Sequence, residues 1–264
     1  MDLLLNTYRA ILQYSGTDYK GFQKQNSGVP TIQNTLEDVL KKISSGKELK
    51  TIGSGRTDTG VHANYQVIKI SMNFNIPARG LKKAINDLLP PAIRIKDLSE
   101  CEDTFHPIHH AINKEYRYRF TFSQYLDPSL NKYCTNIFGD LDIKLMQDFC
   151  KLYVGTHDFI NYQTMGTDVE STIREIKSCE INPCNLHSMM SNTTKEVFEL
   201  RIVGTGFLKQ MVRLIMGALF EAGKGRVDSN AIKSSLLGGE LKNRLGPVAP
   251  LQGLVLYYVK YPDI

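Results

Sequence analysis

Two charged residues stand two positions apart in a loop rich in glycine and hydroxyl side chains. The loop reads Gly-Ser-Gly-Arg-Thr-Asp-Thr-Gly-Val-His-Ala over residues 53–63, and its charged members are Arg56 and Asp58. Glycines allow backbone conformations and close approaches that other residues do not, so we expect a specifically shaped loop. A carboxylate there could act as a nucleophile or a base, and a guanidinium could bind an anion. The alternative is that Asp58 only bonds its own backbone in an Asx-turn.

The segments around this loop predict regular elements that would hold it. Alternating apolar residues indicate strands, helical spacing indicates amphipathic helices, and Thr31 can cap the first helix. The predicted elements are, in order, a strand over residues 7–14, a helix over 32–43, strands over 50–52 and 66–72, a helix over 81–89 and a strand over 92–99. The order βαββαβ is typical of a ferredoxin-like unit, with an antiparallel sheet and helices on one face.

The second half of the chain predicts a similar series. Its elements are a strand over residues 114–122, a helix over 142–155, strands over 172–179 and 196–203, helices over 207–222 and 229–237, and a strand over 253–259. We therefore expect an α+β fold made of two ferredoxin-like halves with mainly antiparallel sheets. The N-terminal domain (1–104) would carry the loop, and the C-terminal domain (105–264) would complete an active-site cleft between the halves.

Aromatic and basic residues alternate along the strand over 114–122. Tyr116, Tyr118 and Phe120 share one face, and such a stripe is more often core than an RNA-stacking surface. In the predicted helix over 207–222, the stretch from 207 to 217 is apolar enough to be largely buried, and Arg213 is the exception in it. A buried guanidinium needs a carboxylate partner. The alternative is that Arg213 extends from the helix edge into water.

Composition and charge limit the classes of protein to which the chain can belong. The chain has 264 residues and a formal net charge of +5, which permits a polyanionic partner without requiring one. Its five cysteines include no Cys-x-x-Cys pair, so we expect reduced thiols in a cytoplasmic protein, with neither disulfides nor a zinc site. There is no run of about 18 apolar residues and no signal-like N-terminus, so no membrane partner is expected.

Three other motifs do not indicate a catalytic or metal site. Gly204-Thr205-Gly206 suggests a phosphate loop but does not fit the nucleotide-binding patterns, so nucleotide hydrolysis is not expected. His106, His109 and His110 cluster without an acid at ligand spacing, which favours a surface turn over a metal site. His62 is interpreted as a structural hydrogen-bonding residue.

The residues 55–63, Gly-Arg-Thr-Asp-x-Gly-Val-His-Ala, resemble the signature of the TruA family of tRNA pseudouridine synthases. Four further motifs resemble the same family: Gly-x-x-Tyr-x-Gly-Phe-Gln-x-Gln over 16–25, Lys-x-Tyr-x-Tyr over 114–118, Phe-Leu-x-x-Met-Val-Arg over 207–213 and Ala-Pro-x-x-Gly-Leu-x-Leu over 249–256. Phe22 stands where the family usually has Trp, and we favour packing over base stacking for Phe22 and Tyr19. The segment 105–110 lacks an arginine that the family usually has there.

The resemblance implies that the chain converts uridine to pseudouridine at positions 38, 39 and 40 of the tRNA anticodon stem-loop, without a cofactor, and that it is a homodimer. It implies Asp58 as the catalytic carboxylate, Arg213 beside it and Tyr116 at the active site. Arg56 could replace the flipped base or hold its phosphate. Three routes stay open for the carboxylate: addition to uracil C6, attack at C1′ and removal of a sugar proton.

A non-catalytic RNA-binding protein with two ferredoxin-like units is the alternative. Asp58 separates the two interpretations, because a carboxylate is of no use in holding RNA phosphates but is needed for the isomerisation.

Overall fold

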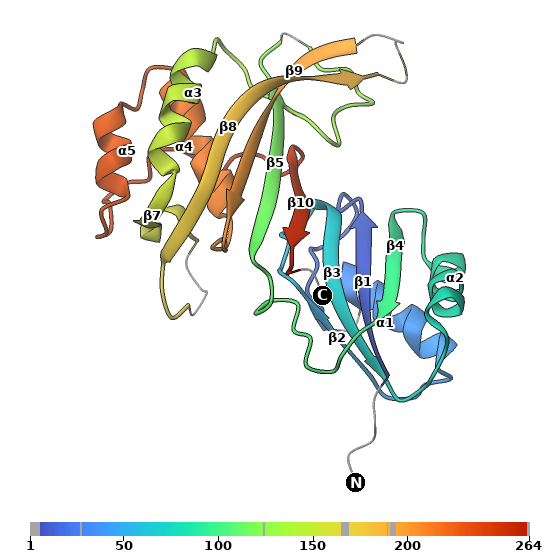
Figure 1. Cartoon of the computed structure of the whole chain (residues 1–264). Helices are drawn as coiled ribbons and strands as arrows, with labels where there is room; N and C mark the ends of the chain where they lie inside the picture. Colours follow the sequence, from blue (N-terminus) through green and yellow to red (C-terminus); the bar gives the residue numbers. More distant parts are fainter. Residues whose placement is uncertain are drawn as a thin grey trace. The chain divides into compact units, whose positions relative to one another are not determined.

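The computed structural model describes residues 6–26, 28–123, 125–164, 169–188, 190 and 194–262. The chain divides into two compact units (Figure 1). Unit 1 consists of Met1–Ile112 and Val255–Ile264, and unit 2 of Asn113–Leu254. The predicted domains, 1–104 and 105–264, stay a prediction, because compactness does not test whether each part folds alone.

Unit 1 contains the element order predicted for the first half. Its elements are β1 (Asn6–Tyr14), α1 (Ile32–Ile43), β2 (Leu49–Gly53), β3 (His62–Met72), α2 (Ala78–Leu88), β4 (Ile93–Glu100) and most of β10 (Leu254–Lys260). The first six run βαββαβ. The antiparallel neighbours are β4 with β1, β1 with β3, and β3 with β2. The last strand, expected to close the second half, pairs here in parallel with β3, Val255 with His62 and Leu256 with Ala63.

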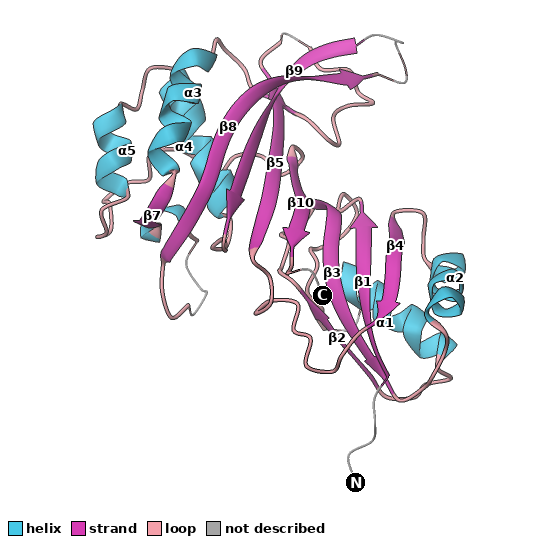
Figure 2. Cartoon of the chain, in the orientation of Figure 1, coloured by secondary structure: helices cyan, strands magenta, loops and turns pink. Residues whose placement is uncertain are grey.

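The core of unit 1 lies between its sheet and its two helices, which cover one face (Figure 2). Tyr8, Ala10 and Leu12 of β1 are buried at alternate positions, as predicted. The N-terminus of α1 is capped as expected, since the Thr31 hydroxyl accepts a hydrogen bond from the N–H of Asn34 at 3.1 Å. The apolar stripe of α1, including Leu36, is buried against this sheet. Hydrophobic periodicity alone therefore predicted most of this unit.

Unit 2 consists of mostly antiparallel strands and helices. Its elements are β5 (Asn113–Thr121), β6 (Thr135–Asn136), α3 (Ile143–Cys150), the 3-10 helix η1 (Lys151–Tyr153), β7 (Gly155–Asp158), the 3-10 helix η2 (Ile160–Tyr162), β8 (Ile173–His187), β9 (Thr194–Gly204), α4 (Met211–Gly223) and α5 (Ser229–Ser235). The strands pair antiparallel in the order β5-β9-β8-β7, and β6 pairs in parallel with β5.

The aromatic face of β5 is core, as predicted. Tyr118 and Phe120 are fully buried, and their rings contact the Phe220 ring of α4 edge to face at centroid distances of 6.1 and 5.1 Å. The Tyr118 hydroxyl donates a hydrogen bond to the Pro250 carbonyl at 2.8 Å. These contacts fix α4 and the segment around Pro250 to the sheet.

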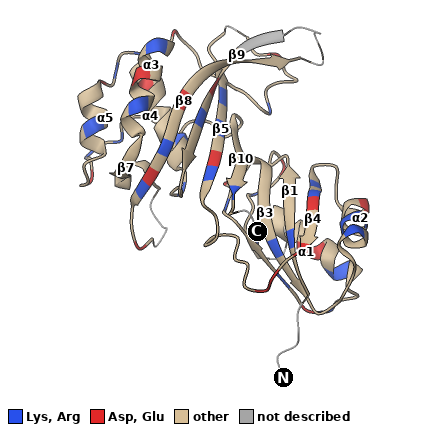
Figure 3. Ribbon diagram, in the orientation of Figure 1, with Lys and Arg blue, Asp and Glu red and all other residues tan. Residues whose placement is uncertain are grey.

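The opposite face of β5 carries the charged residues Glu115, Arg117 and Arg119, and Figure 3 shows charges of both signs on this strand. Five side chains of β5 and β9 form a chain of ion pairs that we call the charged ladder: Arg201, Glu115, Arg117, Glu199 and Arg119, joined in that order at N to O distances of 3.0, 2.7, 3.1 and 2.7 Å. Within the ladder, each guanidinium contacts at least one carboxylate.

Helix α4 differs from the prediction at its start. The apolar spacing predicts a helix from residue 207, but the helix begins at Met211 because Gln210 adopts a left-handed conformation with φ of 61°. Phe207 instead packs edge to face on Tyr116, with ring centroids 5.0 Å apart. A tertiary contact therefore overrides the helical pattern in this segment.

The chain is thus a mixed α+β protein with mostly antiparallel strand pairing, as expected at this level of description. Within the described residues, no helix is long and apolar enough to cross a membrane.

Candidate active site

The loop that carries Arg56 and Asp58 joins β2 to β3, as predicted, and its base is hydrogen-bonded to β3. The N–H of Ser54 donates to the Val67 carbonyl at 2.8 Å, and the Ser54 hydroxyl donates to Oε1 of Gln66 at 3.0 Å. Nε2 of Gln66 donates in turn to the Gly55 carbonyl at 2.6 Å. Ser54 and Gln66 are fully buried. The base of the loop is therefore anchored in the interior of unit 1.

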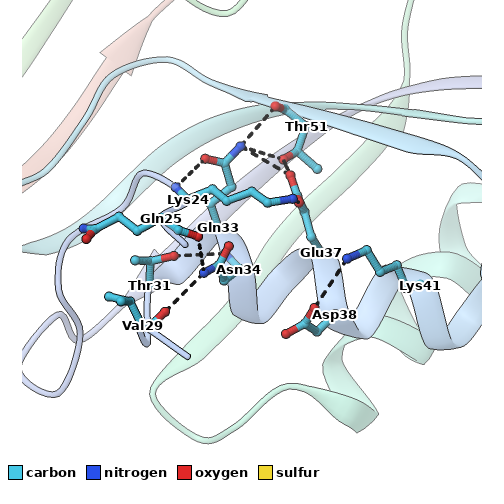
Figure 4. A network of polar contacts seen from close by, with 10 residues as sticks. All are labelled: Lys24, Gln25, Val29, Thr31, Gln33, Asn34, Glu37, Asp38, Lys41 and Thr51. Carbon is cyan, nitrogen blue, oxygen red and sulfur yellow. Dashed lines mark hydrogen bonds and ion pairs between the residues drawn. The ribbon is translucent and has the colours of Figure 1, made fainter. Parts of the chain in front are cut away.

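A buried polar network fixes β2, the strand that leads into the loop (Figure 4). Nε2 of Gln33 donates to the Thr51 hydroxyl at 2.9 Å, which donates to Oε1 of Glu37 at 2.7 Å. Lys24 pairs with the other oxygen of Glu37 at 2.6 Å. These groups come from α1, β2 and the segment before α1. The network therefore connects β2, and with it the start of the loop, to α1 and to the segment before it.

A second loop, residues 15–22, clamps the outer part of the first. The N–H of Phe22 donates to the Thr57 carbonyl at 3.1 Å, and the N–H of Gly60 donates to the Tyr19 carbonyl at 3.1 Å. The hydroxyls of Tyr14 and Thr57 share a buried hydrogen bond of 2.8 Å. The sequence marked both loops as motifs but gave no sign that they bind each other.

An aromatic ring explains one of the glycines. A Cβ atom added at Gly53 would lie 2.4 Å from Cε1 of Phe22, far inside contact distance. Phe22 is buried and stacks on Tyr14 with ring centroids 6.5 Å apart. The packing interpretation of Phe22 is therefore confirmed. Tyr19 is half-buried, and burial raises the pKa of its hydroxyl.

The clamped loop presents its two charged residues on either side of a buried one. Thr57 is buried, whereas Arg56 is exposed and Asp58 half-buried. The turn after Asp58 is closed by backbone atoms, the N–H of Val61 donating to the Asp58 carbonyl at 3.1 Å. The turn thus has a backbone bond that does not use the Asp58 carboxylate, so the Asx-turn is not required to close it.

His62 has the structural role that was expected. It is buried at the start of β3, and its Nδ1 accepts a hydrogen bond from the N–H of Gly16 at 3.2 Å. This bond is a further link between the two loops.

Tyr116 and Arg213 lie in unit 2. Tyr116 is buried on β5 against Phe207, with 9% of its surface exposed. Arg213 is half-buried in the first turn of α4, and its Nε donates to the Ala249 carbonyl at 2.7 Å. The N–H of Ala249 donates back to the Arg213 carbonyl at 3.1 Å. The segment around Ala249 therefore orients the guanidinium, a role that the sequence did not reveal.

The structure thus places Arg56 and Asp58 together on unit 1, and Tyr116 and Arg213 on unit 2. The predicted pairing of Arg213 with Asp58 stays a prediction.

The histidine cluster lies in a turn, as expected. Nδ1 of His106 accepts hydrogen bonds from the N–H groups of Ile108 and His109 at 3.3 and 3.4 Å. Burial, and to a lesser degree the neighbouring His109 and His110, lower the pKa of His106. Within the described residues, no group of three or more His, Cys, Asp or Glu side chains could hold a metal ion.

A carboxylate and a guanidinium that emerge together from one hydrogen-bonded loop suit an enzyme that acts on an anionic substrate. Comparison with known proteins agrees with this class. The model of the family described as tRNA pseudouridine synthase matches residues 10–109 and 149–262. The chain belongs to the tRNA pseudouridine synthase family.

Curated relatives cover nearly the whole chain. A protein named tRNA pseudouridine synthase A from Geobacillus sp. (strain WCH70) is 36% identical over 257 residues, 97% of this chain and 98% of its own. Proteins of the same name from Thermoanaerobacter sp. (strain X514) and Listeria monocytogenes serovar 1/2a are 34% and 32% identical, covering 95% and 97% of this chain and 98% and 100% of their own.

Proposed function

We propose that this protein isomerises uridine to pseudouridine at positions 38, 39 and 40 of the tRNA anticodon stem-loop, with Asp58 as the catalytic carboxylate. Family membership and the full-length relatives support the reaction. The observation that carries the proposal is the doubly clamped loop between β2 and β3, from which Arg56 and Asp58 emerge around buried Thr57. Such preorganisation is what positioning a reactive group requires.

The reaction is balanced without an oxidant, a reductant or a second substrate. The bond between C1′ and N1 breaks, the uracil turns over, and a bond forms between C5 and C1′. N1 gains a proton and C5 loses one, so substrate and product are isomers. An ionised Asp58 can start this sequence by any of the three routes that the sequence left open.

The other candidate residues assist this carboxylate. In our proposal the Arg213 guanidinium, oriented by the Ala249 carbonyl, acts with Asp58 and keeps it ionised, because a neighbouring cation lowers a carboxyl pKa. Tyr116 stacks on the uracil or assists the late loss of the C5 proton. Arg56, exposed on the loop, fills the space left by the flipped base or holds its phosphate.

We also infer that each unit derives from a ferredoxin-like half and that the working enzyme is a cytoplasmic homodimer which needs no cofactor. The strand order β4-β1-β3-β2 of unit 1, antiparallel throughout, supports the ferredoxin-like origin. The dimer and the location rest on the family resemblance and on cysteine usage.

The test is to incubate the protein with unmodified tRNA transcripts and to map pseudouridine at single-nucleotide resolution. We expect new pseudouridine at positions 38, 39 and 40 where the transcript has uridine there, without added metal or cofactor. Tight binding of the transcripts with no pseudouridine at any position would instead support the non-catalytic RNA-binding interpretation.

A further inference from the structure

Gln66 is a polar residue in an otherwise apolar row of β3. Side chains at alternate positions of a strand point to the same side, so Gln66 shares a face with Ile68, Ile70 and Met72. All four residues are fully buried. An apolar side chain would fit this row, whereas a buried amide is unfavourable unless its hydrogen bonds are made. The amide at this position is therefore explained by the groups that it binds.

Both ends of the Gln66 amide bind the loop between β2 and β3. Oε1 accepts a hydrogen bond from the Ser54 hydroxyl at 3.0 Å, and Nε2 donates one to the Gly55 carbonyl at 2.6 Å. The amide can make both bonds at once because its oxygen is an acceptor and its nitrogen is a donor. A thioether could replace neither bond, and an ionised carboxylate could replace only the first.

The bond to the Gly55 carbonyl acts directly on Arg56. The carbonyl of one residue and the N–H of the next belong to one planar peptide unit, so this bond orients the peptide that joins Gly55 to Arg56. Glycine tolerates many backbone conformations, and the bond from Gln66 restrains this one from outside the loop. On the other side of Arg56, the Thr57 carbonyl accepts a hydrogen bond from the N–H of Phe22 at 3.1 Å. The exposed Arg56 side chain therefore starts from a defined backbone.

The supports of the loop act on different residues. Gln66 acts at the base of the loop, on the peptide before Arg56. The hydroxyl of Tyr14 bonds instead to Thr57, which directly precedes Asp58. A substitution of Gln66 should therefore affect the contribution of Arg56 first.

We propose that Gln66 is a positioning residue for Arg56. Its amide holds the peptide between Gly55 and Arg56 so that the guanidinium meets the RNA substrate in one orientation. The inference rests on the proposed function, in which Arg56 fills the space left by the flipped base or holds its phosphate. Gln66 is fully buried and acts on the substrate only through the loop.

The first experiment is a double-mutant cycle of Gln66→Met and Arg56→Ala with an unmodified tRNA transcript. Gln66→Met keeps the length of the side chain but removes both hydrogen bonds. It should slow single turnover roughly tenfold and weaken tRNA binding by a few fold, because a functional group that is displaced loses its contribution steeply. In the Arg56→Ala background, the same substitution should change either quantity by less than about twofold, since Gln66 acts through Arg56.

Two outcomes of this cycle would overturn the proposal. One is a wild-type rate and affinity in Gln66→Met. The other is a pair of effects that multiply in the double variant, which would show that Gln66 acts independently of Arg56. Both quantities are measured, so the cycle closes on tRNA affinity if Arg56→Ala forms no product.

Gln66→Glu tests the donated hydrogen bond while the shape of the side chain is kept. A protonated carboxyl can accept from Ser54 and donate to the Gly55 carbonyl, whereas the carboxylate cannot donate. Burial raises the pKa of a carboxyl, so this variant should turn over at nearly the wild-type rate at low pH. As the pH rises through that pKa, its rate should fall to the level of Gln66→Met. The wild-type amide does not titrate and should show no such step.

The folded fraction is measured at each pH, so that loss of folding is not counted as loss of rate. A rate for Gln66→Glu that stays at the level of Gln66→Met at low pH, or that follows the wild-type pH profile throughout, would overturn the proposal. A residue that only fills space would not depend on the proton that its side chain donates. This comparison also decides the matter if Gln66→Met does not fold.

Ile70→Met is the matched control. It changes a fully buried side chain on the same face of β3, four residues further from the loop, by a swap of similar size. Its single-turnover rate and tRNA affinity should match those of the wild type, even where its unfolding free energy falls. Equal slowing in Ile70→Met would show that any change in this row slows the reaction, and the specific role of Gln66 would be rejected.

Pseudouridine mapping on the same transcripts separates the two proposals. Product formation by the wild type, together with an unchanged rate and affinity in Gln66→Met, rejects only the positioning role. Absence of product with the wild type rejects the proposed reaction, whatever the variants do.

Discussion

The two units hold their candidate catalytic residues in different ways. In unit 1, Arg56 and Asp58 lie on an irregular loop that backbone and buried side-chain hydrogen bonds clamp on two sides. In unit 2, Tyr116 lies on a regular strand against the Phe207 ring, and Arg213 lies in the first turn of a helix, where it donates a hydrogen bond to the Ala249 carbonyl. In unit 1 a hydrogen-bond network holds an irregular loop, whereas in unit 2 regular elements carry the groups.

This difference determines which substitutions affect chemistry and which affect folding. Substitutions of buried residues that support the loop should alter both the unfolding free energy and the reaction rate, because the base of the loop is bonded to the interior of unit 1. Changes at Arg213 should alter the rate more than stability, because in our proposal its side chain acts with the catalytic carboxylate.

Arg213→Ala should lower the single-turnover rate by about 100-fold or more, since misplacing a catalytic group by about 1 Å can cost that much. Binding of tRNA should stay within about tenfold. In the proposed pairing the guanidinium keeps Asp58 ionised, so its loss should shift the pH range of the remaining activity upward relative to the wild type. An unshifted pH profile with a normal rate would remove Arg213 from the site.

Gly53→Ala should destabilise unit 1 by about 1 to 3 kcal/mol, because the new Cβ would overlap the Phe22 ring. It should also slow single turnover by roughly tenfold through displacement of the loop. Gly80→Ala is the control: Gly80 lies in α2 with its nearest neighbour at 3.6 Å, so alanine should stabilise the helix by about 0.5 to 1 kcal/mol. Chemical denaturation and single-turnover kinetics measure both effects.

Tyr14→Phe should have the smallest effect. It removes the 2.8 Å hydrogen bond to Thr57, with a loss of about 1 kcal/mol in unfolding free energy and a rate reduction of a few fold. Tyr8→Phe is the matched control on the same strand, because it removes a 2.8 Å bond to the Ile76 carbonyl, which is not in the loop. It should cost similar stability without slowing the reaction. Equal rates in the two variants would show that the clamp on Thr57 does not position Asp58.

Local patterns were sufficient to predict the first six elements of unit 1 and the loop. Alternation in β1, the Thr31 cap of α1 and the glycines around Arg56 and Asp58 are signals within a few residues of the features they specify. Strand order is not local, so the sequence did not show that Val255 and Leu256 pair with β3. The contacts that hold the loop were not predicted for the same reason. The contact of Phe22 with Gly53 and the bond between Tyr14 and Thr57 join segments far apart in the chain.

The start of α4 shows a second limit. Residues 207–210 continue the apolar helical spacing, yet Gln210 is left-handed and Phe207 packs on Tyr116. A contact between strand and loop outweighs helix propensity over so short a segment. The carbonyl that orients Arg213 comes from Ala249, 36 residues further along the chain, which no periodicity could indicate.

The central claim is that the carboxylate of Asp58 performs the chemistry. Its most direct test is the single-turnover rate of pseudouridine formation by Asp58→Asn, measured together with tRNA affinity. The amide keeps the shape of the side chain but cannot act as nucleophile or base, so we predict no detectable product and an affinity within about tenfold of the wild type. An Asn variant that forms pseudouridine at a rate near that of the wild type would contradict the account.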